Sequence, residues 1–398
     1  MPTDSNAWPA AAAQFDYHPR TRVVFGLNAI ERVGSLAAEL GARNVLLVTD
    51  RGIVSAGHAG RVGRLLQEAG LSVCCFDAVE ENPGTRCVEQ CLEAARRSNI
   101  DTILGLGGGS SLDTAKGCNF LLTNGGRMQD YWGIGKARQP MLPLIAVPTT
   151  GGTGSECQSF ALITDEQTRQ KMACGDPKAA ARIALLDPAL TLSQPPRVTA
   201  CSGIDAIAHA VETAVSRKRT ALSLLFSRES LRLTLAGLPR VLAAPDDLEA
   251  RGWMLLGAAW AGTAIENSMV GAAHSAANPL TARFGIVHGH AVGLMLPHVV
   301  RFNARDPAAA QTYAELACAA GLAPPSAAPA EAAAQLATLL QGILDLARLP
   351  ASLKGLGLAP AQIPGLAVEA ARQWTAQFNP RPVAVADFES IYSAALSI

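Results

Sequence analysis

Histidines concentrate in the second half of this chain. Five of the seven lie between positions 209 and 298: His209, His274, His288, His290 and His298. Asp205 stands four residues before His209, which places both side chains on one face of a helix, one turn apart. Two more imidazoles from later segments, where His274, His288 and His290 stand, would complete a carboxylate and three-imidazole set. Such mixed oxygen and nitrogen donors suit Fe²⁺ or Zn²⁺ rather than Mg²⁺ or Ca²⁺.

The spacing alone also fits a structural role for these residues. A single histidine on an apolar helix is more often a hydrogen-bonded core residue than a metal ligand, and Asp205 could complement the dipole at the start of its helix. His298, in LMLPHVV, is interpreted as structural or as support for a ligand, and His18 and His58 as surface or loop residues. Gly289 would allow a close turn after His288.

Two glycine-rich segments each follow a hydrophobic run, ILGLGGGSSLDTAKG (103–117) and PTTGGTGSE (148–156). In the first, glycines 107–109 would let the start of a helix approach a pyrophosphate. The match to GxGxxG is incomplete because Ser110 takes the place of the third glycine, so a tight strand-to-helix turn is the alternative. In the second segment, Thr149, Thr150 and Thr153 offer hydroxyls to a ribose or a phosphate.

Asp50 ends the hydrophobic run NVLLVTD (44–50). An acidic residue there can accept hydrogen bonds from both ribose hydroxyls of NAD, and it repels the additional phosphate of NADP. In the usual fingerprint, however, this residue follows the glycine loop by about 20 positions, whereas Asp50 precedes it. A helix N-cap or turn role for Asp50 therefore stays open.

The elements that must position these residues differ between the two halves. Up to about residue 190, hydrophobic runs (44–50, 71–79, 101–110 and 142–154) alternate with amphipathic stretches such as 58–70 and 85–99. This order predicts βαβ units and a Rossmann-like parallel sheet covered on both faces. Beyond Pro195 only Ala/Leu-rich helical stretches follow. We expect a flexible tail over 1–20, an α/β dinucleotide-binding domain over 21–195 and an all-α domain over 196–398.

Composition restricts the class of protein. Lys+Arg and Asp+Glu are both 33, so no basic field exists to attract nucleic acid. Nine cysteines without a CxxC pair indicate reduced thiols. The apolar stretch 252–265 is shorter than the roughly 20 residues of a membrane-spanning helix and predicts a buried helix. With no signal peptide pattern at the N-terminus, we expect a soluble, cytoplasmic protein without nucleic acid or membrane partners.

Taken in order, these motifs resemble the iron-containing (group III) alcohol dehydrogenase family. Five segments stand in the order found in the family: GGGSSLDTAKG, PTTGGTGSE, GIDAIAHAVE, the segment around His274 and the segment from His288 to His298. The resemblance extends from about residue 18 to NPRPV (379–383). The resemblance implies a dehydroquinate synthase-like architecture, in which an N-terminal dinucleotide domain and a C-terminal helical domain enclose metal and substrate. It also implies a homodimer or larger homo-oligomer.

Site residues carry over from the family position by position. The implied metal ligands are Asp205, His209, His274 and His288. The implied cofactor contacts are Asp50, Asn82, Gly108, Gly109, Ser110, Asp113, Thr149, Thr150, Thr153 and Lys171, with Lys171 reaching the nicotinamide ribose. Many members have a histidine where this chain has Asn278, and an amide does not shuttle protons near neutral pH. We expect Asn278 to contact substrate, and His290 is the alternative for a proton route.

The activity implied is a metal-dependent, NAD-linked alcohol dehydrogenase or aldehyde reductase. It would transfer hydride between a metal-bound small alcohol, or its carbonyl product, and nicotinamide, with Fe²⁺, or Zn²⁺ as the alternative, acting as Lewis acid. Small apolar residues in the helical half, with Met269 and Leu280, favour a small substrate. Alternatives of the same fold are a glycerol dehydrogenase-like, a maleylacetate reductase-like and a dehydroquinate synthase-like enzyme. A non-catalytic NAD-binding protein is a further alternative.

Overall fold

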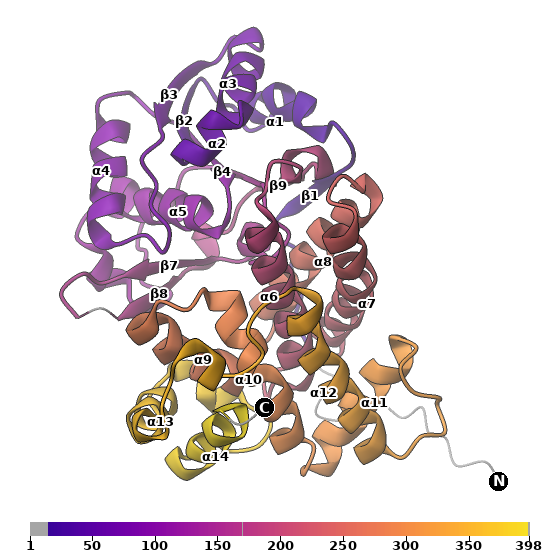
Figure 1. The fold of residues 1–398 in the computed structure, drawn as a ribbon. Helices are drawn as coiled ribbons and strands as arrows, with labels where there is room; N and C mark the ends of the chain where they lie inside the picture. The colour runs from indigo at the N-terminus through magenta and orange to yellow at the C-terminus, as the bar shows by residue number, and fades with distance from the viewer. Residues whose placement is uncertain (1–14, 169, 397–398) are drawn as a thin grey trace. The chain divides into compact units, whose positions relative to one another are not determined.

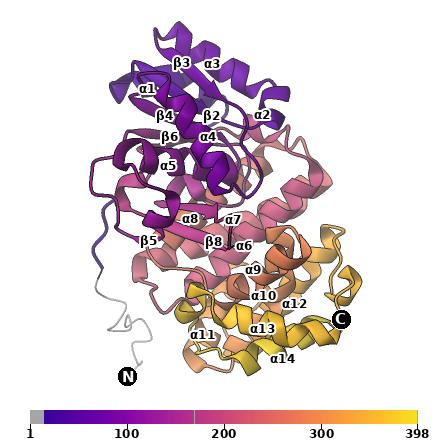
Figure 2. The same ribbon diagram turned by 90° about the vertical axis from the view of Figure 1, so that its left-hand side faces the viewer.

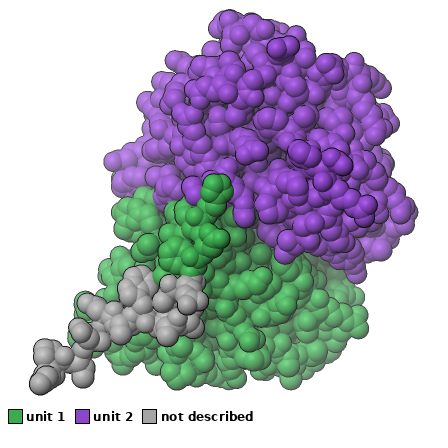
Figure 3. Space-filling model, turned by 180° about the vertical axis from the view of Figure 1, so that it is seen from behind, with its two compact units in different colours: residues 1–18, 200–243, 263–398 green, residues 19–199, 244–262 purple. Residues whose placement is uncertain are grey.

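The computed structural model describes residues 15–168 and 170–396, and these form two compact units (Figure 3). The sheet unit contains Pro19–Thr199 and Ala244–Gly262. The helical unit contains Ala200–Ala243 and the described residues from Thr263 onward, together with the short segment before Pro19. Most of the tail expected over 1–20 falls outside the described residues.

A parallel sheet forms the centre of the sheet unit, as the sequence pattern predicts. Among the described residues it has six strands in the order β1-β9-β6-β4-β2-β3, all neighbours parallel (Figure 1). Their bounds are β1 Arg22–Phe25, β2 Asn44–Val48, β3 Ser72–Phe76, β4 Thr102–Gly107, β6 Leu144–Pro148 and β9 Ile183–Leu186. The ends of β2, β4 and β6 therefore carry Asp50 and both glycine loops at one edge of the sheet.

Helices cover both faces of this sheet. They are α1 Val33–Glu39, α2 Arg51–Ser55, α3 His58–Glu68, α4 Thr85–Arg96 and α5 Gly109–Asn124. Leu46 and Ile103 belong to a core with α4 and α5, whereas Val45 and Leu104 belong to a core with α1 and α3. Because neighbouring residues of a strand point to opposite faces, the near-continuous hydrophobic runs of a parallel sheet serve both cores.

A second, smaller sheet lies beside α5 and was not expected from the sequence. It has the order β5-β8-β7 among the described residues, with bounds β5 Gly133–Ile134, β7 Phe160–Thr164 and β8 Lys171–Gly175. β7 and β8 form an antiparallel pair, and β7 packs against α5. This sheet brings Lys171, at the start of β8, into the sheet unit.

Residues 244–262 join the sheet unit although they lie within the helical second half of the sequence. They include most of α8 (Leu248–Glu266), whose Leu255 and Ala259 share a core with β9. Glycine permits this packing: a Cβ on Gly262 would lie 2.1 Å from the carbonyl oxygen of Gly154. The buried helix predicted over 252–265 is therefore confirmed. Among the described residues, no helix has both the length and the apolar character needed to cross a bilayer.

The helical unit contains the remaining helices. They are α6 Pro196–Val215, which begins within the sheet unit, α7 Ala221–Ala243, α9 Ala272–Phe284, α10 His288–Asn303, α11 Pro307–Ala319, α12 Pro329–Leu346, α13 Ile363–Ala371 and α14 Val385–Leu396. α9 packs against α10 and α13, and α14 packs against α10 and α13 (Figure 2). The α/β plus all-α fold class expected from the sequence is confirmed.

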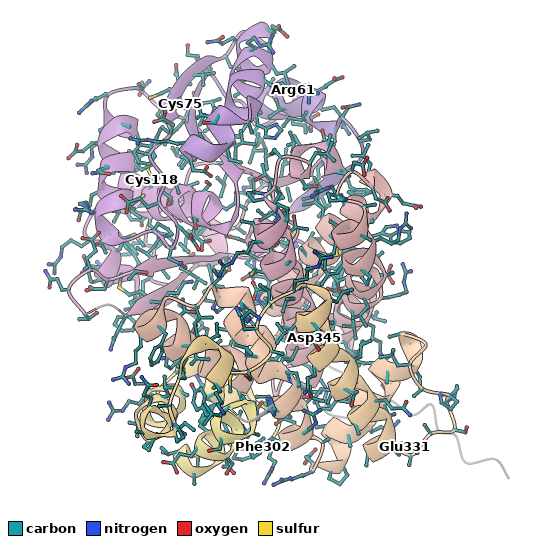
Figure 4. All side chains as sticks on the ribbon, in the orientation of Figure 1. Arg61, Cys75, Cys118, Phe302, Glu331 and Asp345 are labelled. Atoms are coloured by element: carbon teal, nitrogen blue, oxygen red, sulfur yellow. The ribbon has the colours of Figure 1, made fainter. Side chains whose placement is uncertain are left out.

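The cysteines are thiols throughout the described chain. All nine are free. Cys75 is exposed, whereas Cys118 is fully buried in the core beneath α5 (both labelled in Figure 4). Burial raises the pKa of the Cys91 thiol well above its ordinary value, so this core thiol is protonated and unreactive.

Candidate metal centre and dinucleotide-binding loops

The four predicted metal ligands converge within the helical unit. Oδ1 of Asp205, on α6, lies 3.6 Å from Nε2 of His209, 3.5 Å from Nε2 of His274 and 3.8 Å from Nε2 of His288. The rings of His209 and His274 stack with centroids 4.8 Å apart. Three helices thus bring three imidazoles to within 3.5–3.8 Å of one carboxylate oxygen, and the candidate ligand atoms of Asp205, His209 and His274 all lie within 4.8 Å of one another.

The donor set fits a divalent cation. For metal–ligand bonds of about 2.0–2.2 Å, ligand atoms of a tetrahedral site stand roughly 3.3–3.6 Å apart, close to the distances around Asp205. These distances exceed those of good hydrogen bonds. Accordingly, Oδ1 of Asp205 and Nε2 of His274 are buried without a hydrogen-bond partner among the described residues. Buried polar atoms without a partner are costly, and a shared cation would satisfy both.

The electrostatics of the cluster agree with this fit. Burial would raise the pKa of Asp205, but the surrounding His209, His274 and His288 outweigh it and hold that pKa below its ordinary range. Burial would lower the pKa of His274, but the carboxylates of Glu212 and Asp205 raise it to about 9. The cluster therefore favours positive charge at the point where the ligand atoms meet. A bound cation would replace the proton on Nε2.

Solvent reaches this cluster at His288. The side chains of Asp205, His209 and His274 are 7–8% exposed, whereas that of His288 is 25% exposed. A small molecule could therefore approach the ion position from the side of His288, while the other three ligands stay shielded from water.

A glycine lets the fourth ligand approach the others. A Cβ on Gly289 would lie 1.9 Å from the carbonyl oxygen of Cys201 on α6. The sequence interpretation of a close turn at Gly289 is wrong, because this residue lies in the first turn of α10. Glycine is needed there because α10 and α6 pack closely together, and Gly293 packs against Ile204 in the same way.

Glu212 is a site residue that the sequence analysis missed. Its Oε2 accepts a short hydrogen bond from Nδ1 of His274, opposite the ligand atom of that ring. The signal was present in the sequence, because Glu212 follows Asp205 by seven positions and so shares its helix face.

The remaining candidates of the helical half have protein partners. Nε2 of His290 bonds the carbonyl oxygen of Pro350 at 2.8 Å, and the residue is 1% exposed. Asn278, one turn after His274 on α9, donates from Nδ2 to Oε1 of Gln373 at 3.1 Å. Burial lowers the pKa of His298 to about 4, so its imidazole is neutral. The proton and substrate roles of His290 and Asn278 stay predictions.

In the sheet unit, the two glycine loops pack directly on one another. A Cβ on Gly109 would lie 2.8 Å from Cγ2 of Thr153, and one on Gly108 would lie 3.4 Å from Cγ2 of Thr150. The backbone N–H of Thr149 donates to the carbonyl oxygen of Gly107 at 2.9 Å. Glycine at 109 is thus required for contact between the loops, besides any close approach of a ligand.

Asp50 lies against the first glycine loop. Its Oδ1 accepts from the backbone N–H of Ile53 at 3.0 Å, so the expected N-cap role is present. Its Oδ2 receives only a long hydrogen bond, 3.4 Å, from the hydroxyl of Ser111. This oxygen can therefore still accept a hydrogen bond from a ribose hydroxyl. Asp50 lies beside the glycine loop although it precedes that loop in the sequence, because β2 is the neighbour of β4 in the sheet.

Three further predicted contacts meet near the start of α5. The backbone N–H of Asn82 donates to the hydroxyl of Ser110 at 3.2 Å, and Oδ1 of Asn82 accepts from Nζ of Lys171 at 3.2 Å. Asn82 has a φ of 51°, a left-handed conformation that asparagine tolerates better than most residues. These residues form a polar group beside the glycine loop.

Asp113 belongs to a buried network beneath the loops. Its Oδ1 accepts from the hydroxyl of Ser155 at 2.6 Å and its Oδ2 from the backbone N–H of Leu162 at 3.2 Å. Lys116 is fully buried, and its Nζ donates to the carbonyl oxygens of Ser155 and Phe160 at 2.6 and 2.9 Å. Asp113 thus supports the second glycine loop from inside, and its contact with a cofactor stays a prediction.

Both halves of the chain match models of one protein family. Residues 19–188 match iron-containing alcohol dehydrogenase, and residues 199–396 match the C-terminal region of the Fe-containing alcohol dehydrogenase family. An NAD-dependent methanol dehydrogenase of Bacillus methanolicus is 32% identical over 373 residues, which cover 94% of this chain and 97% of that protein.

Two further proteins show how widely this similarity extends. A choline dehydrogenase of Bacillus subtilis (strain 168) is 33% identical over 382 residues, covering 95% of this chain and 94% of the relative. The crystal structure of a 1,3-propanediol oxidoreductase superposes with a TM-score of 0.92 at 31% identity, covering 96% of this chain and all of that one. The chain therefore belongs to the iron-containing alcohol dehydrogenase family, which confirms the family, the fold and the oxidoreductase class expected from its motifs.

Proposed function

We propose that this chain catalyses the NAD-linked oxidation of a small alcohol, and the reverse reduction of the corresponding carbonyl compound, at a divalent cation held by Asp205, His209, His274 and His288. The observation that carries the proposal is the convergence of three imidazole Nε2 atoms on one buried carboxylate oxygen. When bound, the cation supplies Lewis acidity toward the alcohol oxygen, and the nicotinamide supplies the hydride acceptor.

The residues of the helical unit prepare the alcohol for this chemistry. Asp205 contributes the negative charge that the three imidazoles lack, and burial of three of the ligands keeps water from one side of the reacting group. Asn278 stands one turn from His274, with its amide held by Gln373. We propose that this amide orients the substrate by hydrogen bonding, without carrying the proton.

The residues of the sheet unit hold the dinucleotide. We propose that the loop from Gly107 to Ser110, at the N-terminus of α5, receives the pyrophosphate through backbone N–H groups. Asp50 would accept the ribose hydroxyls and so select NAD over NADP. The remaining contacts are the predicted set of Asn82, Asp113, Thr149, Thr150, Thr153 and Lys171.

The proposal also includes the identity of the metal ion and the size of the substrate. The absence of a cysteine ligand among the four residues is compatible with Fe²⁺ and with Zn²⁺, and we propose Fe²⁺ because of the family to which the chain belongs. Relatives named for methanol and choline act on alcohols of different size and charge. We propose a small alcohol for this chain.

The decisive experiment loads metal-free protein with Fe²⁺ under anaerobic conditions, or with Zn²⁺, and follows NADH absorbance over a panel of small alcohols with NAD and with NADP. The proposal expects NADH to accumulate with at least one alcohol, and faster with NAD than with NADP. Substrate loss without net NADH would instead indicate a dehydroquinate synthase-like lyase, and metal-independent turnover would indicate a maleylacetate reductase-like enzyme. Binding of NAD without any turnover would refute catalysis.

Assembly and location remain separate proposals. We propose a homodimer or larger homo-oligomer, which light scattering after size exclusion would test. We also propose a reducing, cytoplasmic compartment, because all nine cysteines are thiols.

A further inference from the structure

Glu212 links the metal cluster to the start of helix α9. Its Oε2 accepts from Nδ1 of His274, and its Oε1 accepts from the backbone N–H groups of Gly271 and Ala273 at 3.1 and 2.7 Å. Glu212 is 4% exposed and lies on α6, two turns beyond Asp205. One carboxylate therefore satisfies two otherwise unpaired N–H groups of a helix terminus and one ligand ring.

The charge of Glu212 is compensated where it lies. The N-terminus of α9 carries positive partial charge, which stabilises a carboxylate placed against it. The third N–H group of this terminus, that of Ala272, donates to Oδ1 of Asn379 at 3.4 Å instead. Two side chains thus share the capping of α9, but among them only Glu212 contacts the imidazole of His274.

Asn379 is itself held firmly by its neighbours. Its Nδ2 donates to the carbonyl oxygen of Arg381 at 2.6 Å and to Oδ1 of Asn303 at 2.7 Å. The guanidinium of Arg381 lies 3.9 Å from the ring centroid of Phe302, which Figure 4 labels. Asn379 therefore provides a matched comparison for Glu212, because it caps the same helix from a fixed position without touching a ligand.

We propose that Glu212 is a positioning residue for the metal centre, which fixes the tautomer and the direction of the His274 ring while it anchors the helix that carries this ring. The proposal rests on the function proposed above. When Nδ1–H donates to Glu212, Nε2, which lies 3.5 Å from Oδ1 of Asp205, is the ring nitrogen that would bind the cation in place of a proton. Carboxylates that bond the outer nitrogen of a ligating histidine also raise its basicity toward the metal.

The variant Glu212→Gln separates orientation from capping. Its amide oxygen can still accept from the N–H groups of Gly271 and Ala273, so helix α9 keeps its cap. The amide NH₂ group then faces Nδ1 of His274, which must become an acceptor. The ring proton consequently moves to Nε2, the atom that should bind the metal. We expect metal affinity to fall by roughly 10- to 100-fold, the range found when such partners are removed.

The test compares the wild-type chain with Glu212→Gln and Asn379→Ala. Competition with a chelator gives the dissociation constants of Zn²⁺ and Fe²⁺ for each protein, and urea unfolding gives the stability of each metal-free protein. We expect Glu212→Gln to lose metal affinity. We expect Asn379→Ala to lower the free energy of unfolding but to keep its metal affinity within about threefold of the wild type, well below the tenfold change that corresponds to 1.4 kcal/mol. Unchanged affinity in Glu212→Gln, or an equal loss in both variants, overturns the inference.

A measurement on the unaltered protein completes the test. In the Zn²⁺-loaded chain labelled with ¹⁵N-histidine, two-bond ¹⁵N–¹H spectra should show His274 protonated at Nδ1 and metal-bound at Nε2, with the signal assigned by its loss in His274→Gln. A proton on Nε2 of this ring refutes the inference even if the variant does not fold. A wild-type chain that binds neither ion refutes the proposed function and this inference with it, whereas unchanged affinity in Glu212→Gln refutes the inference alone.

Discussion

Glu156, in the second glycine loop, gives the sharpest stability prediction in the sheet unit. The residue is 1% exposed, and its Oε1 has no hydrogen-bond partner among the described residues. Burial raises the pKa of its carboxyl from the ordinary 4.5 to about 7, although the charge of Lys116 opposes this shift. Because the folded state binds this proton more tightly than the unfolded state, the free energy of unfolding falls as the pH rises between these two values.

The magnitude follows from the size of the shift. At 1.36 kcal/mol for each pH unit, a rise from 4.5 to about 7 corresponds to about 3 kcal/mol of stability. The loss is absent below the unfolded pKa and complete above the folded one, so most of it, about 2–3 kcal/mol, appears between pH 5 and pH 8. The substitution Glu156→Gln keeps the shape of the side chain and removes the ionisation. It should therefore stabilise the protein at pH 8 relative to pH 5 by that amount.

The assay is urea unfolding of the wild-type chain and Glu156→Gln at half-unit steps from pH 5 to pH 8. Taking the difference between the two proteins at each pH cancels the other titrating groups. The difference should grow with pH and level off above about pH 7. A difference that stays constant across this range, or that shrinks with rising pH, would show that the carboxyl is not buried as described.

Three further substitutions test the two units. Lys116→Met removes the buried cation beside Asp113 and should lower the free energy of unfolding by roughly 3–5 kcal/mol, as urea titration would show; a change below 1 kcal/mol would contradict the network. Asp50→Ser keeps a capping oxygen but loses the charge, so the preference for NAD over NADP in kcat/KM should fall roughly ten- to thirtyfold, and an unchanged preference would remove Asp50 from cofactor selection. Asn278→His should add an ionisation near pH 6.5 to the pH profile of kcat; an unaltered profile would place this position away from the proton path.

Much of the fold was accessible from the sequence. The runs 44–50, 101–110 and 142–154 contain β2, β4 and β6, because a strand buried on both faces leaves a continuous hydrophobic signal. The run 71–79 contains β3, an edge strand that is only partly buried. The strands that were missed lack this local context. β1 pairs with β9 through Arg22 and Ile183, which are far apart in the chain. Between β8 and β9 stands a 3-10 helix of three residues, Pro177–Ala179, which is too short to mark a βαβ unit.

Some residues of the candidate site could be predicted from their spacing in the sequence, and others could not. Helix periodicity pointed to the pairing of Asp205 with His209, and the family resemblance added His274 and His288 to the predicted ligand set. Glu212 could have been found from its seven-residue spacing to Asp205. Lys116 could not, because lysine is almost never fully buried, and only the structure shows which carbonyl oxygens surround it.

The glycines show a further limit of sequence reasoning. Gly109 and Gly289 were interpreted through a ligand and a turn. The structure shows that each lets two segments of the chain approach closely. A sequence reveals that a side chain is absent at such a position, but not which neighbouring group requires its absence.

The most direct test of the metal centre is the metal content of the purified chain, measured by mass spectrometry alongside alcohol-dependent NADH formation. His209→Ala is the informative variant and His58→Gln its matched control, because His58 lies in the sheet unit and bonds Ser193. We predict about one divalent ion per chain for the wild type and for His58→Gln, and loss of both ion and turnover for His209→Ala. Retention of the ion and the turnover by His209→Ala would show that His209 is not a metal ligand.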